Sequence, residues 1–259
     1  MDLLSITAII NKEGYTARVV EVPKGSAMKF AIEMGEGNIK ALIYKDNINA
    51  SGTDEEIAKV IIETYRKVPK PNLNLDNVFD LDYIKENVFV AVRRPLEDDA
   101  FTKNFLDMQL VLKVRLTEGA TYTVKVPMAE KLGIGEDMFE DAIHNMTFKF
   151  QSMADALGIP EEFMDSVQIW VLSTENKLFG AAAMADAELL STIAENLDSD
   201  LIVIPSSTHE VLIYKLEKDS DMDQISKMVR EVNSQEVADY EQISDHAYIF
   251  HRNLKSFTW

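Results

Sequence analysis

The residues with the clearest chemical potential lie in one short block of the C-terminal half. Ser206, Ser207, His209 and Glu210 follow an apolar run that ends at Pro205. A serine nucleophile needs a base within hydrogen-bond reach and a group that orients the base, and these residue types could supply all three. The glycines of a G-x-S-x-G elbow are absent, and triad members usually come from separate elements. We therefore favour a structural loop, in which the serines cap backbone amides and His209 hydrogen-bonds within the loop. Binding and catalysis are the alternatives.

A second block, residues 178–184, joins two large apolar residues to a glycine and three alanines. Residues without bulky side chains allow two backbones to pack closely. The block is not a phosphate-binding loop, because no Gly-Lys-Ser/Thr follows it. We expect it to neighbour residues 205–212 where two strands end. The candidate binding residues around the serine–histidine loop are then Gly180, Ala181, Ala182 and Asp245. For the glycine and the alanines we favour close packing, and a ligand-facing role is the alternative.

The sequence predicts no metal site and no cofactor. It contains no cysteine, which excludes disulfides, thiolate nucleophiles and zinc–thiolate sites. The four histidines are scattered along the chain. An Asp-x-Asp-x-Asp run from Asp219 begins like a calcium loop, but Gln224 replaces the required glycine. We interpret these acids as the first turn of a helix. A divalent site formed by Asp245, His246 and a distant acid is the alternative.

The charge of the chain limits its partners. It carries 26 Lys and Arg against 44 Asp and Glu, which gives a net charge of −18. Residues 1–100 contribute −4 and residues 101–259 contribute −14. This field repels nucleic acid and anionic membranes, because phosphate binding needs cations. It is typical of a solubilising surface or of a surface that attracts a basic protein partner.

The apolar runs of the chain are short. None approaches the roughly 20 residues that cross a bilayer. The apolar N-terminal run lacks the basic region of a secretion signal and ends early at Asn11. Together with the lack of cysteine, this predicts a cytoplasmic protein.

Apolar spacing and turn residues predict an α+β fold in two lobes, with mixed, largely antiparallel sheets covered by helices. Residues 15–45 read as strands, and Thr53-Asp54-Glu55-Glu56 is a capping box for a helix that stops before Pro69. Further helices are expected at residues 80–86, 136–145, 150–157, 186–197 and 222–232. Further strands are expected at residues 88–93, 106–116, 121–126, 167–173, 178–182, 201–204, 211–216 and 246–250.

The domain boundary is expected in the charged stretch from Arg93 to Lys103, which contains Pro95 and few apolar residues. It separates residues 1–100, a strand-rich lobe with one long helix, from residues 101–259, an α+β domain. The second domain carries both motif blocks.

Several blocks occur in a fixed order. They are Phe105-Leu106-Asp107-Met108, Ala142-Ile143-His144-Asn145, Leu178-Phe179-Gly180-Ala181-Ala182, Pro205-Ser206-Ser207-x-His209-Glu210-Val211-Leu212, Val229-Arg230-Glu231-Val232-Asn233 and Ser244-Asp245-x-x-Tyr248. Over residues 105–252 the chain resembles an uncharacterised family of clostridial gut bacteria, domain of unknown function 5688. Residues 1–100 share only its strand–strand–strand–helix outline, and Lys103-Asn104 replaces the Pro-His expected before Phe105.

The resemblance implies a fold and a bacterial or mobile-element origin, but no activity. Two functional hypotheses follow from the residues. The first is a macromolecule-binding protein whose acidic surface faces a basic protein, without direct binding to nucleic acid or membrane. The second is a hydrolase- or transferase-like enzyme, which requires a concave pocket into which His209 points. Its candidate catalytic residues are Ser206, Ser207, His209 and Glu210.

Overall fold

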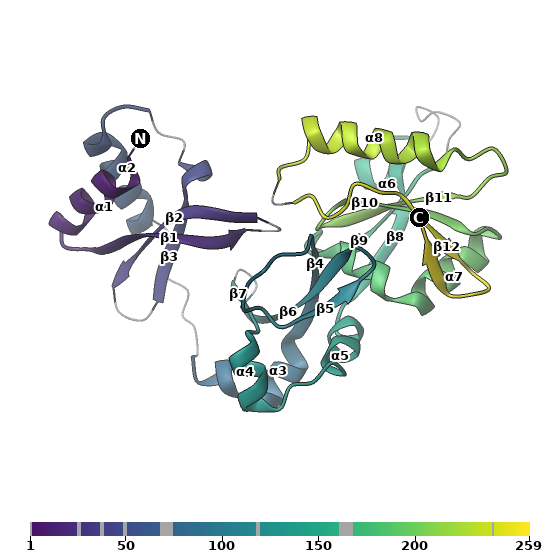
Figure 1. The fold of residues 1–259 in the computed structure, drawn as a ribbon, viewed down its shortest axis with the longest axis horizontal. Helices are drawn as coiled ribbons and strands as arrows, with labels where there is room; N and C mark the ends of the chain where they lie inside the picture. Colours follow the sequence, from purple (N-terminus) through teal and green to yellow (C-terminus); the bar gives the residue numbers. More distant parts are fainter. Residues whose placement is uncertain are drawn as a thin grey trace. The chain divides into compact units, whose positions relative to one another are not determined.

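The computed structural model describes residues 2–24, 27–36, 39–48, 51–67, 75–117, 120–160, 168–239 and 241–259. The chain divides into two compact units, residues 1–72 and 73–259 (Figure 1). The fold is α+β, with helices packed on largely antiparallel sheets. The fold class expected from the sequence is therefore confirmed.

The first unit packs two helices against a three-stranded sheet of order β1-β2-β3. Its elements are α1 (Leu3–Lys12), β1 (Thr16–Lys24), β2 (Ala27–Glu36), β3 (Ile39–Tyr44), the 3-10 helix η1 (Lys45–Asn47) and α2 (Asp54–Lys67). Ile6 and Ile10 of α1 are buried with Ile57 and Ile61 of α2, and with Ile32 of the central strand. Sequence reasoning missed α1, which begins at the capping residue Asp2.

The expected capping box starts α2. The Thr53 amide donates to the Glu56 carboxylate at 2.9 Å, and the Glu56 amide donates to the Thr53 hydroxyl at 3.3 Å. Two backbone donors that the helix cannot satisfy are thereby paired. This prediction is confirmed.

The division of the chain falls after Asn72, and not between residues 93 and 103. Strand β4 (Val88–Arg93) pairs along its whole length with β6 (Met108–Thr117). Arg93 also forms an ion pair with Asp98 at 2.8 Å. The charged stretch is therefore part of the second unit, whereas the sequence predicted a boundary near residue 100.

The second unit contains a four-stranded and a six-stranded sheet. The first has the order β4-β6-β5 with β7 paired to β6, and the second has the order β13-β12-β10-β11-β9-β8. Besides β4 and β6, its elements are η2 (Leu75–Phe79), α3 (Leu81–Asn87), β5 (Thr102–Phe105), β7 (Ala120–Thr123), α4 (Val126–Leu132), α5 (Met138–His144), β8 (Phe148–Ser152), α6 (Met153–Leu157), β9 (Trp170–Thr174), the 3-10 helix η4 (Gly180–Ala185), α7 (Ala187–Leu197), β10 (Leu201–Ser207), β11 (Glu210–Lys215), α8 (Met222–Gln235), β12 (Tyr248–His251) and β13 (Ser256–Thr258).

Strand β10 is buried on both faces, so its side chains enter two different clusters. Leu201 and Val203 belong to the main core that the two sheets share with α5, α7 and η4. Ile202 and Ile204 pack with Val229 of α8 on the opposite face. Figure 1 shows α8 lying across this sheet. The alternation follows from the two-residue period of a strand.

Two expected elements are corrected. The helix expected at residues 150–157 is strand β8 followed by the short helix α6, which Ser152 caps. Pairing of β8 with β9 overrides the helical spacing. The strand expected at residues 178–182 is a turn followed by η4. Its first amides bond to the carbonyls of a loop, and not to a neighbouring strand. Strands β5 and β13 were not expected.

Candidate functional site

The two motif blocks meet through their backbones. The Gly180 amide donates to the His209 carbonyl at 3.0 Å, and the Ala181 amide donates to the Thr208 carbonyl at 3.4 Å. The Ser173 hydroxyl donates to the same His209 carbonyl at 2.7 Å. The expectation that residues 178–184 neighbour residues 205–212 is confirmed.

This junction requires glycine at position 180. A Cβ atom at this position would lie 2.5 Å from the Ser173 hydroxyl and 2.6 Å from the Ser173 Cα, and would also overlap the His209 carbonyl oxygen. Backbone atoms cannot swing away as the end of a long side chain can. Gly180 therefore lets β9 and the β10–β11 loop approach the start of η4.

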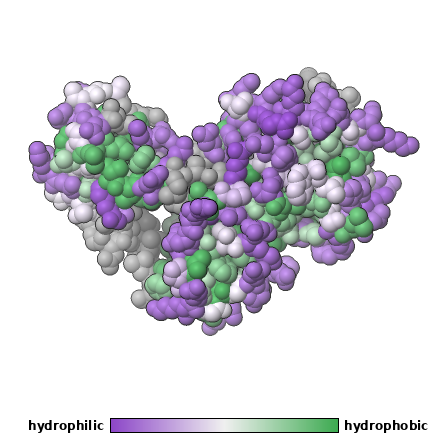
Figure 2. All heavy atoms as spheres, in the orientation of Figure 1, coloured by the Kyte–Doolittle hydropathy of each residue, from purple (hydrophilic) through white to green (hydrophobic). Residues whose placement is uncertain are grey.

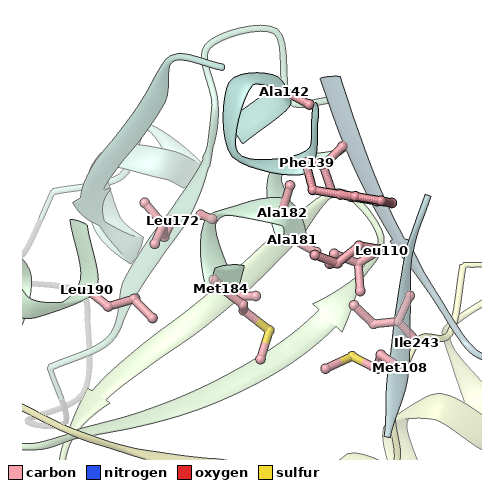
Figure 3. Close-up of a cluster of buried hydrophobic side chains, with 14 of the residues drawn as sticks. Met108, Leu110, Phe139, Ala142, Leu172, Ala181, Ala182, Met184, Leu190 and Ile243 are labelled. Atoms are coloured by element: carbon pink, nitrogen blue, oxygen red, sulfur yellow. The ribbon is translucent and has the colours of Figure 1, made fainter. Parts of the chain in front are cut away.

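The alanines of the block face the interior. Ala181, Ala182 and Ala183 are 0% exposed and belong to the main core. Figure 3 shows Ala181 and Ala182 among Leu110, Phe139 and Met184. Small side chains at these positions let η4 sit between the two sheets. This burial agrees with the close-packing interpretation of Ala181 and Ala182.

The polar side chains of the serine–histidine loop bond mainly to the loop itself. The Ser206 hydroxyl donates to Glu210 at 3.0 Å, and the Ser207 hydroxyl accepts from the His209 amide at 3.1 Å. Thr208 donates to the Val92 carbonyl at 2.9 Å, which ties the loop to the end of β4. Within the described part of the chain, no hydrogen bond joins the His209 ring to either serine. The serines thus stabilise a turn, as the structural interpretation expected.

The ring of His209 bonds outside the loop. Its Nδ1 accepts a hydrogen bond from the Phe179 amide at 3.2 Å, and the two rings lie 5.8 Å apart. The expected bond within the loop is thus made by the His209 amide, to Ser207, whereas the ring bonds to the other motif block. An accepting Nδ1 places the proton of the neutral ring on Nε2. His209 therefore holds Phe179, which has a left-handed backbone with φ of 59°.

Asp245 lies near the loop but serves a different contact. Its carboxylate forms an ion pair with Arg94 at 2.5 Å and accepts from the Asn233 amide group at 3.0 Å. Thr208 and Asp245 thereby contact the last residues of β4 and the residue that follows it. Asp245 links this segment to α8, and its side chain remains partly exposed.

Sequence reasoning missed a second polar cluster, formed by Asp107, Ser244, His246 and Tyr248. The Tyr248 hydroxyl donates to Asp107 and lies 2.5 Å from the Ser244 hydroxyl. His246 Nε2 lies 3.8 Å from Asp107. These residues lie in the sequence blocks Phe105–Met108 and Ser244–Tyr248, which the family resemblance had singled out. The sequence did not indicate that Asp107 and Tyr248, 141 residues apart, would form a hydrogen bond.

This cluster holds the β5–β6 hairpin on β12. Asp107 sits in the turn of the hairpin, next to Leu106, whose φ of 56° is left-handed. Burial raises the pKa of Tyr248 far above its ordinary value, and the hydrogen bond to Asp107 adds to this effect. The phenol therefore stays protonated at neutral pH and acts as a donor, not as a base.

Two small pockets flank the turn between β9 and η4. One has a volume of about 230 Å³ and is lined by residues that include Phe89, Arg115, Glu175 and Phe179. The other has a volume of about 190 Å³, and its lining includes Lys149 and residues of α6. Glu210 lines the second pocket, whereas His209 lines neither of these two.

The acidic run before α8 has the expected structural role, because Asp221 caps the helix by accepting from the Gln224 amide at 3.0 Å. Among the residues that the structure describes, no three His, Asp or Glu side chains gather in a way that could hold a metal ion. In the same residues, no helix has the length and apolar character needed to cross a bilayer.

Comparison with sequence models of known families shows to which family the chain belongs. The sequence model of a family of unknown function (DUF5688) matches residues 9–252. The chain belongs to this family. The match covers nearly the whole chain, so the DUF5688 resemblance is wider than the expected residues 105–252. Searches of the curated proteins and of the solved structures each found no match.

Proposed function

We propose that this DUF5688 protein binds a basic protein through its acidic second unit, in a cytoplasmic setting. The observation that carries the proposal is the division of charge between the two units. Residues 1–72 contain ten Lys and Arg and ten Asp and Glu. Residues 73–259 contain 16 Lys and Arg and 34 Asp and Glu. The entire net charge of −18 therefore belongs to the second unit.

The surface of α8 and its flanking residues is the part of this unit that we assign to the partner. Its exposed carboxylates include those of Asp219, Asp223, Glu231 and Glu236. Figure 2 shows strongly hydrophilic residues over α8. Met228 and Val232, one helical turn apart, are each 46% exposed. An apolar centre with a charged rim is a common form of protein interface.

Electrostatic attraction would act before contact. A surface of one sign steers an oppositely charged partner and raises the association rate, and salt screens the attraction. The same field disfavours nucleic acid and anionic membranes. Binding of a basic protein is therefore expected to weaken as the salt concentration rises.

The geometry of the serine–histidine loop does not favour catalysis. Ser206 and Ser207 bond within the loop, and the Nδ1 of His209 is occupied by the Phe179 amide. A nucleophile needs a direct hydrogen bond to its base. The loop instead fixes the junction between two elements, which is a structural task.

The test compares two matched fourfold variants. One carries Asp219→Asn, Asp223→Asn, Glu231→Gln and Glu236→Gln; the control carries Glu13→Gln, Glu21→Gln, Glu55→Gln and Glu63→Gln in the first unit. Proteins retained by the immobilised full-length chain are identified, and the dissociation constant of the strongest purified binder is measured at several salt concentrations.

We expect the binder to be basic. Its affinity should fall by about tenfold or more with rising salt and in the α8 variant, but stay within about twofold in the control. Binding that does not respond to salt, or that responds equally to both variants, contradicts the proposal.

A further inference from the structure

The pocket of about 230 Å³ is built by segments far apart in the sequence. Strands β4, β6 and β7 contribute Phe89, Arg115 and Thr121, and the turn from Thr174 to Phe179 contributes further lining residues. Its volume is smaller than the roughly 300–1,000 Å³ typical of sites for drug-sized ligands. The pocket therefore suits a small molecule.

One wall of the pocket is aromatic. The rings of Phe89 and Phe179 lie 5.2 Å apart at an interplanar angle of 45°. His209 holds the Phe179 backbone in a left-handed conformation through the amide of Phe179. The junction of the two motif blocks therefore positions one wall of the pocket. A flat apolar group would pack favourably against these rings.

Two opposite charges line the same pocket without neutralising each other. The Arg115 guanidinium lies 5.5 Å from the centre of the Phe89 ring. Glu175, in the turn after β9, is exposed and lines the same pocket. In the described part of the chain, no ion pair joins Arg115 or Glu175 to any residue. Both charges are therefore available to a ligand.

The surroundings of Arg115 favour a carboxylate. Lys113 lies two residues earlier on the same face of β6, donates to the Thr123 hydroxyl at 3.1 Å, and lies 5.8 Å from the centre of the Phe179 ring. Burial lowers the pKa of Lys113, and the positive charges of Arg93 and Lys125 lower it further. Lys113 is thus a second basic side chain on the sheet beside the pocket, although the unit as a whole is strongly acidic.

The turn adds a further donor. The Asn176 side-chain oxygen accepts from the Thr174 hydroxyl at 2.8 Å and from the Leu178 amide at 3.2 Å. These bonds orient the side chain and assign its NH₂ group to the opposite side. Asn176 and Arg115 line the same pocket, and an amide donor together with a guanidinium is well suited to a carboxylate.

We propose that this pocket binds a free α-amino acid with an aromatic side chain. The ligand carboxylate pairs with Arg115, the ammonium group pairs with Glu175, and the ring packs against Phe89 and Phe179. Arginine presents a planar pair of donors that matches a carboxylate. A ligand with both charges uses both unpaired groups, whereas a ligand with one charge leaves the other group unused. This inference is independent of the proposed binding of a basic protein at α8.

The first experiment tests the two charged groups of the ligand one at a time. Titration calorimetry on the full-length protein compares L-phenylalanine with 3-phenylpropanoate, which lacks the ammonium group, and with 2-phenylethylamine, which lacks the carboxylate. We expect L-phenylalanine to bind at least about tenfold more tightly than either probe, because each lost charged contact weakens binding by about this factor. Absence of L-phenylalanine binding, or equal affinity for a singly charged probe, overturns the proposal.

The second experiment assigns the contacts. Arg115→Gln should weaken L-phenylalanine binding by about tenfold or more. Glu175→Gln should weaken L-phenylalanine but leave 3-phenylpropanoate unchanged. Lys218→Gln removes one exposed positive charge outside the pocket lining and should leave the affinity within about twofold. Arg115 and Glu175 are exposed, so circular dichroism and melting temperature should match those of the unmodified protein. Equal losses in Arg115→Gln and Lys218→Gln overturn the assignment.

Discussion

The two units reach their folds in different ways. In the first unit, local patterns determine most elements: a capping box starts α2, and isoleucines spaced along α1 and α2 form the core. In the second unit, the decisive contacts join distant residues, such as Gly180 with His209 and Asp107 with Tyr248. The first unit is electrically neutral, whereas the second carries −18. The difference teaches that the family motifs mark long-range junctions and not local elements.

The largest expected effect tests a long-range junction. Gly180→Ala should lower the free energy of unfolding of the second unit by about 4 kcal/mol or more, because the added methyl group overlaps backbone atoms of Ser173 and His209. Hydrogen exchange followed by mass spectrometry can read each unit separately. Peptides from residues 75–259 should exchange faster, and peptides from residues 3–67 should not change.

Gly135→Ala is the matched control in the same unit. A Cβ atom there would approach only the mobile end of the Asp137 side chain, at 2.6 Å. We expect a loss below about 1 kcal/mol. If both variants destabilise the protein equally, the close approach of Ser173 and His209 is not what requires glycine at position 180.

A smaller effect is expected at the Arg93–Asp98 ion pair. The side chains of Arg93 and Asp98 are each 9% exposed, and their two hydrogen bonds measure 2.8 and 2.9 Å. Asp98→Asn should lower the unfolding free energy by about 3 kcal/mol, because it leaves a buried guanidinium without its counter-charge. The neighbouring exposed pair offers the control, and Asp99→Asn should cost less than about 1 kcal/mol.

The same pair predicts a dependence on pH. The hydrogen bonds from Arg93 lower the pKa of Asp98 below its ordinary value. Its stabilising contribution is therefore present above about pH 4 and is lost as the pH falls through the lower folded-state pKa. Chemical unfolding at a series of acidic pH values should show a steeper loss in the unmodified protein than in Asp98→Asn. Parallel curves would show that the pair does not contribute.

The smallest expected effect lies in the first unit. Thr53→Ala removes the hydroxyl that accepts from the Glu56 amide and should cost about 1 kcal/mol. Hydrogen exchange should rise in peptides that cover α2 and remain unchanged in the second unit. Thr192→Ala, an exposed position inside α7, should leave α2 unchanged. Equal changes in both units after Thr53→Ala would contradict their separate stabilisation.

Most elements could be predicted from the sequence, because hydrophobic period and capping residues are local properties. The α+β class, the start of α2 and the strands of β10 and β11 were all accessible in this way. The elements whose type was predicted wrongly depend on partners far away in the sequence. Strand β8 follows a helical spacing but pairs with β9, and η4 forms where Gly180 bonds to a loop 29 residues later.

The site was predicted only in part. The neighbourhood of residues 178–184 and 205–212 followed from their shared position at the ends of strands. The role of His209 did not, because its ring bonds to the Phe179 amide and not to a serine. The pocket was missed entirely, since Phe89 and Arg115 come from strands that the sequence assigned to different domains.

The most direct test of the account concerns the junction between the two motif blocks. Residue-resolved hydrogen exchange should show the Phe179 and Gly180 amides protected to a degree similar to the amides of β10 and β11. In His209→Ala, protection of the Phe179 amide should be lost, while protection of the Gly180 amide, which bonds to the backbone carbonyl, should persist. Rapid exchange of both amides in the unmodified protein would contradict the joined arrangement of the two blocks.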